Sequence, residues 1–490
     1  MRVHPQIDLN IRELEQIFTD CGDFVGRKFP AGGKWMYIAY LDMMSDRAMI
    51  DQTVMSWLIR ADWTKAQHSP ADHWFDRLKD SGMLTADFEI CDCIGEAAGA
   101  LLGGDTALFM DGYDQALIIS TKGFPGRGVS AADTEVVVQG AKEAFSESLR
   151  VNTALVRRRI RDPGLKIKQT KAGRRSQTDI AFLYVEDIVR PAILEEVERR
   201  VARIDIDAIT DSGALEQLIE VNWLSPFPQA QLTERPDKAA AAILEGRIAV
   251  VVDNTPFVMI VPVTLNSFFQ SSEDYYNRWQ TMSLARVVRY AAALMAAALP
   301  GFYLAVDLFH PSMLPLLMIT KMAEARQSAP LPAFAEVLIM DAAFELLREA
   351  SVRLPAAAGG AIGIVGGLII GQAAVEAGLA SPIVVVIAAL TGVSAFSIPS
   401  VALANGFRLI KYLIMGLSAA FGLLGFCVGM LFWLTHTASL RSFGVPYLSP
   451  YAGAKDASDL KDSLFRLPLF MMNKRPFFAN PKQGRRMKSQ

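Results

Sequence analysis

The sequence predicts a soluble α/β N-terminal region of two subdomains, then an α-helical multi-pass membrane domain of about four spans, and last a basic C-terminal tail. Short β-branched runs alternate with helical sequence up to about residue 283. Long charge-free runs follow, each close to the roughly 20 residues that a helix needs to cross a bilayer. The expected boundaries are 1–130 and 131–283 for the two subdomains, 284–440 for the membrane domain and 441–490 for the tail.

Strand and turn signals define the two subdomains. In the first, residues 34–44 read as a strand and residues 107–120 as a hairpin that turns at Asp111-Gly112. In the second, residues 178–187 read as a strand and residues 190–204 as an amphipathic helix. Two β-branched runs in 246–263 flank Asp253-Asn254-Thr255-Pro256, so we expect a second hairpin there.

Four apolar segments predict the membrane spans, near residues 290–309, 354–375, 382–404 and 412–435. Core helices of a soluble protein are the alternative, which four such runs within about 150 residues disfavour. Charged and apolar residues recur together in 331–351, which predicts an amphipathic helix at the membrane interface or lining a polar vestibule. A fifth span could use part of 311–345.

Charge distribution predicts which ends face the cytoplasm. The N-terminus has no apolar signal region, and the sequence from residue 437 onward holds ten Lys/Arg against three Asp. With Arg286 and Arg289 before the first span, both ends are expected inside, which requires an even number of spans. Arg408 and Lys411 then flank the outer side of the last span, against the positive-inside rule.

Enzyme chemistry has no support in the sequence. The four cysteines and five histidines show no zinc spacing, and no phosphate-binding loop, dinucleotide motif or nucleophile elbow is present. We therefore expect no catalytic residues, no metal and no cofactor.

Candidate pore, gating or helix-packing residues lie around the second and third predicted spans. Glycines repeat every four residues there, forming a smooth ridge that suits close packing within one chain or between subunits around a pore. One acid, Glu376, follows the ridge, and three interpretations stay open: a helix end at the surface, a cation-attracting mouth or gate, and a buried proton site. The candidates are Glu376, Gln372, Gly359, Gly363, Gly367, Gly371, Pro382 and Pro399.

A basic stretch at 155–175 carries nine Lys/Arg and one acid, Asp162. Such a surface can bind anionic lipid or an acidic partner, or can simply be solvated. Nucleic acid is disfavoured because interleaved aromatics and a helix-turn-helix pattern are missing. The candidates for a partner or lipid surface are Arg157, Arg158, Arg159 and Arg161.

Several segments together resemble the A subunits of spore germinant receptors, the GerA family. Among the matching segments are "VQGAKEAFSESLRVNTALVRRRIRDPGLK" (138–166), "SPFPQAQLTERPD" (225–237), "GGLIIGQAAVEAGLASP" (366–382) and "SFGVPYLSP" (442–450). The resemblance covers about residues 135–468. It implies a spore inner-membrane protein whose partners are a transporter-like B subunit that binds the nutrient and a lipoprotein C subunit. It also implies a homo-oligomer that forms a ligand-gated cation channel and triggers germination by releasing ions.

Two alternatives to that function stay open at this point. One is a non-conducting scaffold or signalling subunit that couples a transporter-like nutrient sensor to germination. The other is the paralogue associated with the dipicolinate-transport proteins, because residues 1–130 match the family only loosely.

Overall fold

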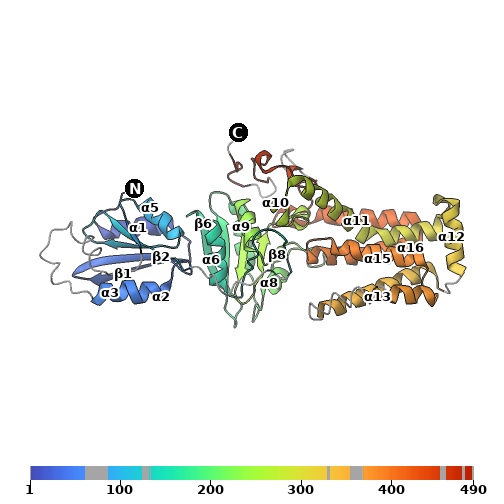
Figure 1. Ribbon diagram of the computed structural model, residues 1–490, viewed down its shortest axis with the longest axis horizontal. Coiled ribbons are helices and arrows are strands. Elements are labelled where there is room, and N and C mark those ends of the chain that lie inside the picture. Colours follow the sequence, from blue (N-terminus) through green and yellow to red (C-terminus); the bar gives the residue numbers. More distant parts are fainter. Residues whose placement is uncertain are drawn as a thin grey trace. The chain divides into compact units, whose positions relative to one another are not determined.

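A computed structural model describes residues 2–60, 87–123, 132, 134–327, 331–353, 367, 369–452, 460–476 and 481–487 (Figure 1). The described chain divides into two compact units. The α/β unit holds residues up to 220 together with 230–262 and 473–490, and the helical unit holds 221–229 and 263–472.

The first sheet of the α/β unit has five antiparallel strands in the order β1-β2-β4-β5-β3. Its strands are β1 (Phe24–Ala31), β2 (Lys34–Leu41), β3 (Phe88–Cys91), β4 (Thr106–Met110) and β5 (Ala116–Ile119). Its helical segments are α1 (Ile7–Ile17), α2 (Arg47–Met49), the π-helix η1 (Ile50–Met55), α3 (Ser56–Arg60) and α5 (Ile94–Leu102). The strand and the hairpin predicted in this part of the sequence are confirmed by β2 and by the β4–β5 pair.

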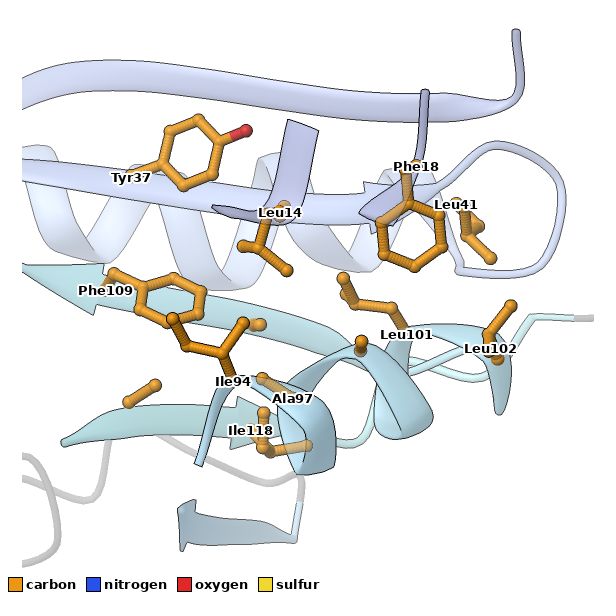
Figure 2. Packing of buried hydrophobic residues seen from close by; sticks show 14 of the residues in the cluster. Leu14, Phe18, Tyr37, Leu41, Ile94, Ala97, Leu101, Leu102, Phe109 and Ile118 are labelled. Atoms are coloured by element: carbon orange, nitrogen blue, oxygen red, sulfur yellow. The ribbon is translucent and has the colours of Figure 1, made fainter. Parts of the chain in front are cut away.

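Both faces of this sheet are covered, because successive residues of a strand point to opposite sides. Along β2, Tyr37 and Leu41 pack with α1 and α5, whereas Met36 and Ile38 pack with η1 and α3. Figure 2 shows the first of these cores, in which buried side chains of α1 and α5 lie against those of β2, β4 and β5.

The second sheet has the order β6-β7-β9-β10-β8 and is also antiparallel. Its strands are β6 (Leu165–Ala172), β7 (Thr178–Val185), β8 (Gln231–Thr233), β9 (Ile248–Val252) and β10 (Val258–Val261). Its helices are α6 (Leu149–Arg159), α7 (Pro191–Ala202), α8 (Ser212–Ile219) and α9 (Pro236–Leu244). The predicted strand, amphipathic helix and hairpin are confirmed by β7, α7 and the β9–β10 pair.

One acid of the second subdomain gives the stability of the α/β unit a pH dependence. Burial, reinforced by the nearby charge of Glu220, raises the pKa of Glu216 from its usual value near 4.5 to about 8. The folded chain therefore holds a proton on Glu216 that the unfolded chain has already released. Folded-state stability falls as the pH rises from about 4.5 to about 8.

Glu216→Gln should remove this pH dependence, because a neutral amide cannot ionise. We expect the variant to be more stable than the wild type by roughly 4 kcal/mol at pH 8 and by less than about 1 kcal/mol at pH 5. Thermal unfolding of the full chain in detergent at the two pH values measures the difference. A constant difference across this range would contradict the assignment.

The helical unit contains three long apolar segments. Its helices are α10 (Glu273–Tyr276), α11 (Trp279–Phe309), α12 (Leu316–Gln327), α13 (Ala333–Arg353), α15 (Pro382–Phe396) and α16 (Val401–Ser439), with helical residues also at 369–376. Short 3₁₀ turns lie at η3 (Leu265–Phe268), η4 (Pro311–Met313) and η6 (Leu469–Met471). Strands β11 (Arg441–Ser442) and β12 (Val445–Pro446) form a small ribbon.

Among the described residues, two helices are long and apolar enough to cross a membrane, α11 and α16. The apolar helix α15 has 15 residues. Large apolar side chains on α16 face outward, among them Leu409, Leu424 and Leu431, each at least 60% exposed. A helix surface of this kind suits lipid or another membrane helix better than water.

Helix α16 folds back on itself at Gly422, which interrupts the span predicted near 412–435. Gly422 has φ 61° and ψ −139°, a conformation outside the helical region. The rings of Phe407 and Trp433 lie 5.4 Å apart, although 26 residues of straight helix would separate them by about 39 Å. Residues 401–421 and 423–439 are therefore two antiparallel arms, called here the first and second arms of α16.

Candidate functional site: a charged cluster among apolar helices

An ion pair joins α13 to the first arm of α16 inside the helical unit. Lys411 Nζ lies 2.6 Å and 2.8 Å from the two carboxylate oxygens of Asp341. Lys411 is 3% exposed and Asp341 6% exposed. Two charges buried this deeply are tolerated only as a pair, since each alone would lose its hydration without compensation.

The neighbouring turns of the same two helices extend the pair into a cluster. Arg408 donates through Nε to Glu345 Oε1 at 2.8 Å and through Nη2 to the other carboxylate oxygen. Lys411 lies 3.7 Å and Arg348 3.5 Å from the Glu345 carboxylate. We call Asp341, Glu345, Arg348, Arg408 and Lys411 the charged cluster; its three cations exceed its two carboxylates by one charge.

A cavity of about 370 Å³ lies beside the charged cluster. All five cluster residues line it, and apolar side chains of α13 and α15 form most of the remaining wall. The apolar part is contributed by Phe344, Leu347, Ala388, Val393 and Phe396, among others. The cavity therefore brings ionised groups next to a surface that excludes water, where charges interact more strongly than in solution.

A second buried acid of α13 fixes the start of α15. Glu336 is 1% exposed and accepts a hydrogen bond from the backbone N–H of Ser381 at 2.8 Å. Ser381 is the N-cap of α15, and its hydroxyl accepts from the backbone N–H of Val384. A carboxylate at a helix N-terminus is stabilised by the free N–H groups and by the helix dipole. Helix α13 thus carries its acids into the helical unit.

Glu376 is exposed and is the last residue of the helical stretch 369–376. The chain leaves that helix through Gly378, whose φ of 67° is a left-handed conformation. The backbone N–H groups of Gly378 and Leu379 donate to the carbonyls of Val375 and Ala374, which caps the helix end. This is the position that the helix-end interpretation expects, and an exposed carboxylate there costs little.

The remaining candidates lie at helix boundaries or packing contacts. Pro382 is the first residue of α15, and Pro399 lies between α15 and α16. A Cβ on Gly371 would lie 3.3 Å from Val385 of α15, so this glycine packs within the chain. Gln372 is exposed, and Gly367 lies near Phe344 and Leu347 of α13. Gly359 and Gly363 lie outside the described residues.

Arg157 does not belong to the predicted basic surface. It is fully buried, and its guanidinium makes two 2.9 Å hydrogen bonds to the carboxylate of Asp23. Burial opposes the charge, but the Asp23 carboxylate more than offsets this and raises the pKa of Arg157. Arg157 lies on α6, which packs against the second sheet, and Asp23 directly precedes β1 of the first sheet. This pair, with the 2.9 Å bond from Gly22 N–H to the Ile167 carbonyl, therefore ties the two subdomains together.

The neighbouring arginines are largely neutralised. Arg158 and Arg159 both bind the carboxylate of Glu143, the latter at 2.7 Å. Burial works against the charge of Glu143, but these arginines prevail and lower its pKa. Of the four residues predicted to form a basic surface, only Arg161 is exposed.

Arg157→Met should destabilise the α/β unit strongly, by about 3–5 kcal/mol, because it leaves the Asp23 carboxylate buried without its cation. The matched control is Arg161→Met, an equal substitution at an exposed position four residues away, which should change stability by less than about 0.5 kcal/mol. Thermal unfolding of the full chain in detergent compares the two. Equal unfolding temperatures for both variants would refute the buried-pair account.

Sequence reasoning missed the charged cluster, although a signal for it was present. Asp341, Glu345 and Arg348 are spaced four and three residues apart, which places them on one face of α13. Arg408 and Lys411 are three residues apart and share a face of α16 in the same way. As exposed charges on the outer side of the last predicted span, they conflicted with the positive-inside rule. Their pairing with α13 removes that conflict. Among the described residues, no group of three or more metal-binding side chains could hold an ion.

The fold and the charged cluster define a class of protein: an α/β region joined to an apolar helical unit that holds ionised groups. A family model described as Bacillus/Clostridium GerA spore germination protein matches residues 12–478. The chain belongs to the GerA family, which includes several spore germination proteins, and this confirms the resemblance seen in the sequence.

Individual relatives match three quarters or more of the chain. Spore germination protein KA of Bacillus subtilis (strain 168) is 37% identical over 97% of this chain and 87% of its own. Spore germination protein B1 of the same organism is 35% identical over 100% of both chains. Stage V sporulation protein AF, also of that organism, is 36% identical over 76% of this chain and 75% of its own.

A solved structure is also similar in sequence. It is the N-terminal domain of the A subunit of the Bacillus megaterium spore germinant receptor GerK3, 30% identical, with a TM-score of 0.43. The match covers 53% of this chain and 96% of that chain.

Proposed function

We propose that this chain is the membrane subunit of a nutrient-responsive germinant receptor and oligomerises as a ligand-gated cation channel that triggers germination by ion release. The observation that carries the proposal is the charged cluster, with Lys411 and Asp341 buried between apolar helices. Ionisable groups inside a membrane domain are costly, and they mark ion pathways and relays far more often than structural positions. The family supplies the germination role.

Two contacts of the C-terminal tail support a topology with both ends on one side. Lys482 N–H donates to the Ile188 carbonyl at 2.9 Å, and Arg475 Nε donates to the Leu244 carbonyl at 2.8 Å. The tail beyond the helices thus contacts the second sheet's subdomain, which supports an even number of crossings of the bilayer. Helices α11 and α15 with the two arms of α16 would supply four crossings. The tail's Lys and Arg residues favour the cytoplasmic side, which is the core side of the spore inner membrane.

The proposed partners are a transporter-like B subunit that binds the nutrient, a lipoprotein C subunit and further copies of this chain. Nutrient binding would then reach the charged cluster through the helical unit. Outward-facing apolar side chains on α15, such as Val386 and Leu390, are 56% and 44% exposed and offer surface for a neighbouring copy.

The test is cation flux from liposomes that contain the purified receptor with its partner subunits. Addition of nutrient should release monovalent cations, and liposomes that lack this chain should stay closed. A complex that binds the nutrient and never conducts would contradict the channel proposal and favour a non-conducting signalling subunit. That alternative draws on one observation, namely that Asp341 and Glu345 are bound by cations of their own cluster.

A further inference from the structure

A short segment that precedes the second sheet's last strands is fixed against α16. Ser225 Oγ and His436 Nε2, on the second arm, are 2.9 Å apart. The ring of Phe227 is 1% exposed and meets the ring of Phe407, on the first arm, edge to face at 5.8 Å. The segment therefore contacts both arms at the end of the hairpin away from Gly422.

A glycine in α16 lets this segment approach so closely. A Cβ on Gly406 would lie 2.8 Å from the carbonyl oxygen of Pro226, closer than a side chain tolerates. Contact of this kind requires glycine on the helix, so the position of residues 225–227 is built into the helical unit.

Apolar side chains just before the fixed residues point outward. Trp223 is 79% exposed, Leu224 73% and Val221 59%. Single exposed apolar residues are common, but three within four positions, next to a rigid attachment, indicate a surface that meets something other than water.

The lengths of the two arms of α16 indicate how deep residues 225–227 lie in the bilayer. Phe407 and His436 are 15 and 14 residues from Gly422, or about 21–23 Å along a helix. The hydrocarbon core of a bilayer is about 30 Å thick, so a turn at its far edge places both residues about 7–9 Å inside its near edge. Arg441, exposed just beyond the second arm, fits the aqueous side of that boundary.

The outward apolar surface of α16 continues to the segment. Phe432, one turn deeper than His436, is 52% exposed and stacks on the His436 ring with centroids 6.3 Å apart. His436 in turn contacts Ser225. The path from Phe432 through His436 leads to Leu224 and Trp223 without a charged residue, which favours lipid over an acidic or basic protein surface.

We propose that Trp223, with Leu224 and Val221 beside it, forms an interfacial anchor that inserts into the lipid headgroup region next to the open end of α16. Tryptophan prefers this depth because its ring is apolar while its N–H can still reach water or headgroups. The anchor sets the position of residues 221–224 along the bilayer normal, at the point where the chain passes from the α/β unit into the helical unit. It rests on the membrane-spanning placement of α16 that the proposed function assumes, but it does not require the chain to conduct.

Quenching of tryptophan fluorescence by brominated lipids tests the anchor in the full chain reconstituted in vesicles. Lipids are brominated either just below the headgroup or near the chain end, and the wild type is compared with Trp223→Phe. The matched control is Trp35→Phe, which removes a 49% exposed tryptophan from the α/β unit. Trp223→Tyr provides the same comparison should the Phe variant not fold.

The Trp223 component is the difference in fluorescence between the wild type and Trp223→Phe. Bromine just below the headgroup should quench this component strongly, and bromine at the chain end should quench it less. The corresponding Trp35 component should be quenched by neither lipid. If aqueous iodide quenches the Trp223 component and brominated lipid does not, the segment faces water and the anchor is refuted. If neither quenches it, a partner protein or second copy covers the segment, which also overturns the proposal. Carbonate extraction reports separately whether the chain is membrane-integrated, so failure of the anchor is distinguishable from failure of the membrane placement.

Discussion

Lys411→Met should destabilise the helical unit by about 3–5 kcal/mol, because it removes the cation from a buried carboxylate and leaves the rest of the site intact. Asp341 is 6% exposed, and both of its oxygens bind the Lys411 ammonium. Methionine matches the length of lysine, so lost packing contributes little. The loss of helical circular dichroism on heating in detergent measures the effect, and Lys321→Met, at an exposed position on α12, is the control.

The double variant Asp341→Leu with Lys411→Met separates the cost of an unpaired charge from the value of the pair. Replacing both partners by apolar side chains avoids any buried unpaired charge, so much of the lost stability should return. This result would show that removing both partners of the ion pair costs little folding stability, whereas removing only the cation costs much. A double variant as unstable as Lys411→Met alone would contradict this account.

Gly422→Ala should prevent the two arms of α16 from closing. At φ 61° and ψ −139° a side chain is strained by about 1–3 kcal/mol, and a new Cβ would lie 2.8 Å from the Cβ and Cγ of Phe309 on α11. Because α11 and α16 form the centre of the unit, we expect a loss of thermal stability in detergent and of germination in spores. The contacts of the first arm with the second, such as that of Phe407 with Trp433, depend on this turn.

The matched control for the hairpin is Gly416→Ala. Gly416 is helical, and no described residue outside its own helix turn lies within 4 Å of the position that its Cβ would take. Alanine is the better helix former there by up to about 1 kcal/mol, so this variant should be neutral or slightly more stable. Equal effects of the two alanines would mean that α16 does not turn at Gly422.

Elements whose signals are local could be predicted from the sequence. The hairpin at residues 246–263 was predictable because its turn residues and its β-branched runs are adjacent in the chain. Helix α7 was predictable in the same way, since Pro191 suits a first turn and apolar residues recur at helical spacing. The position of Glu376 at a helix end was one of three interpretations that the sequence left open.

Features that depend on distant residues could not be predicted. The Asp341–Lys411 pair joins positions 70 residues apart, and the Arg157–Asp23 pair joins positions 134 apart. A basic stretch looks the same in sequence whether its arginines face water or buried acids, so Arg157 was wrongly placed on a surface. The turn in α16 was hidden because Gly422 is one of several glycines there, and its non-helical φ and ψ are visible only in the structure.

The central claim is that the charged cluster lies on a cation path opened by nutrient. A charge swap, Asp341→Lys with Lys411→Asp, tests this directly because it keeps an ion pair between α13 and α16 and reverses its direction. The measurement is nutrient-triggered cation flux, and its selectivity among monovalent ions, from liposomes holding the complete receptor. The account predicts that the swapped receptor assembles and binds nutrient but shows altered flux and altered ion selectivity. Flux and selectivity identical to the wild type would contradict it.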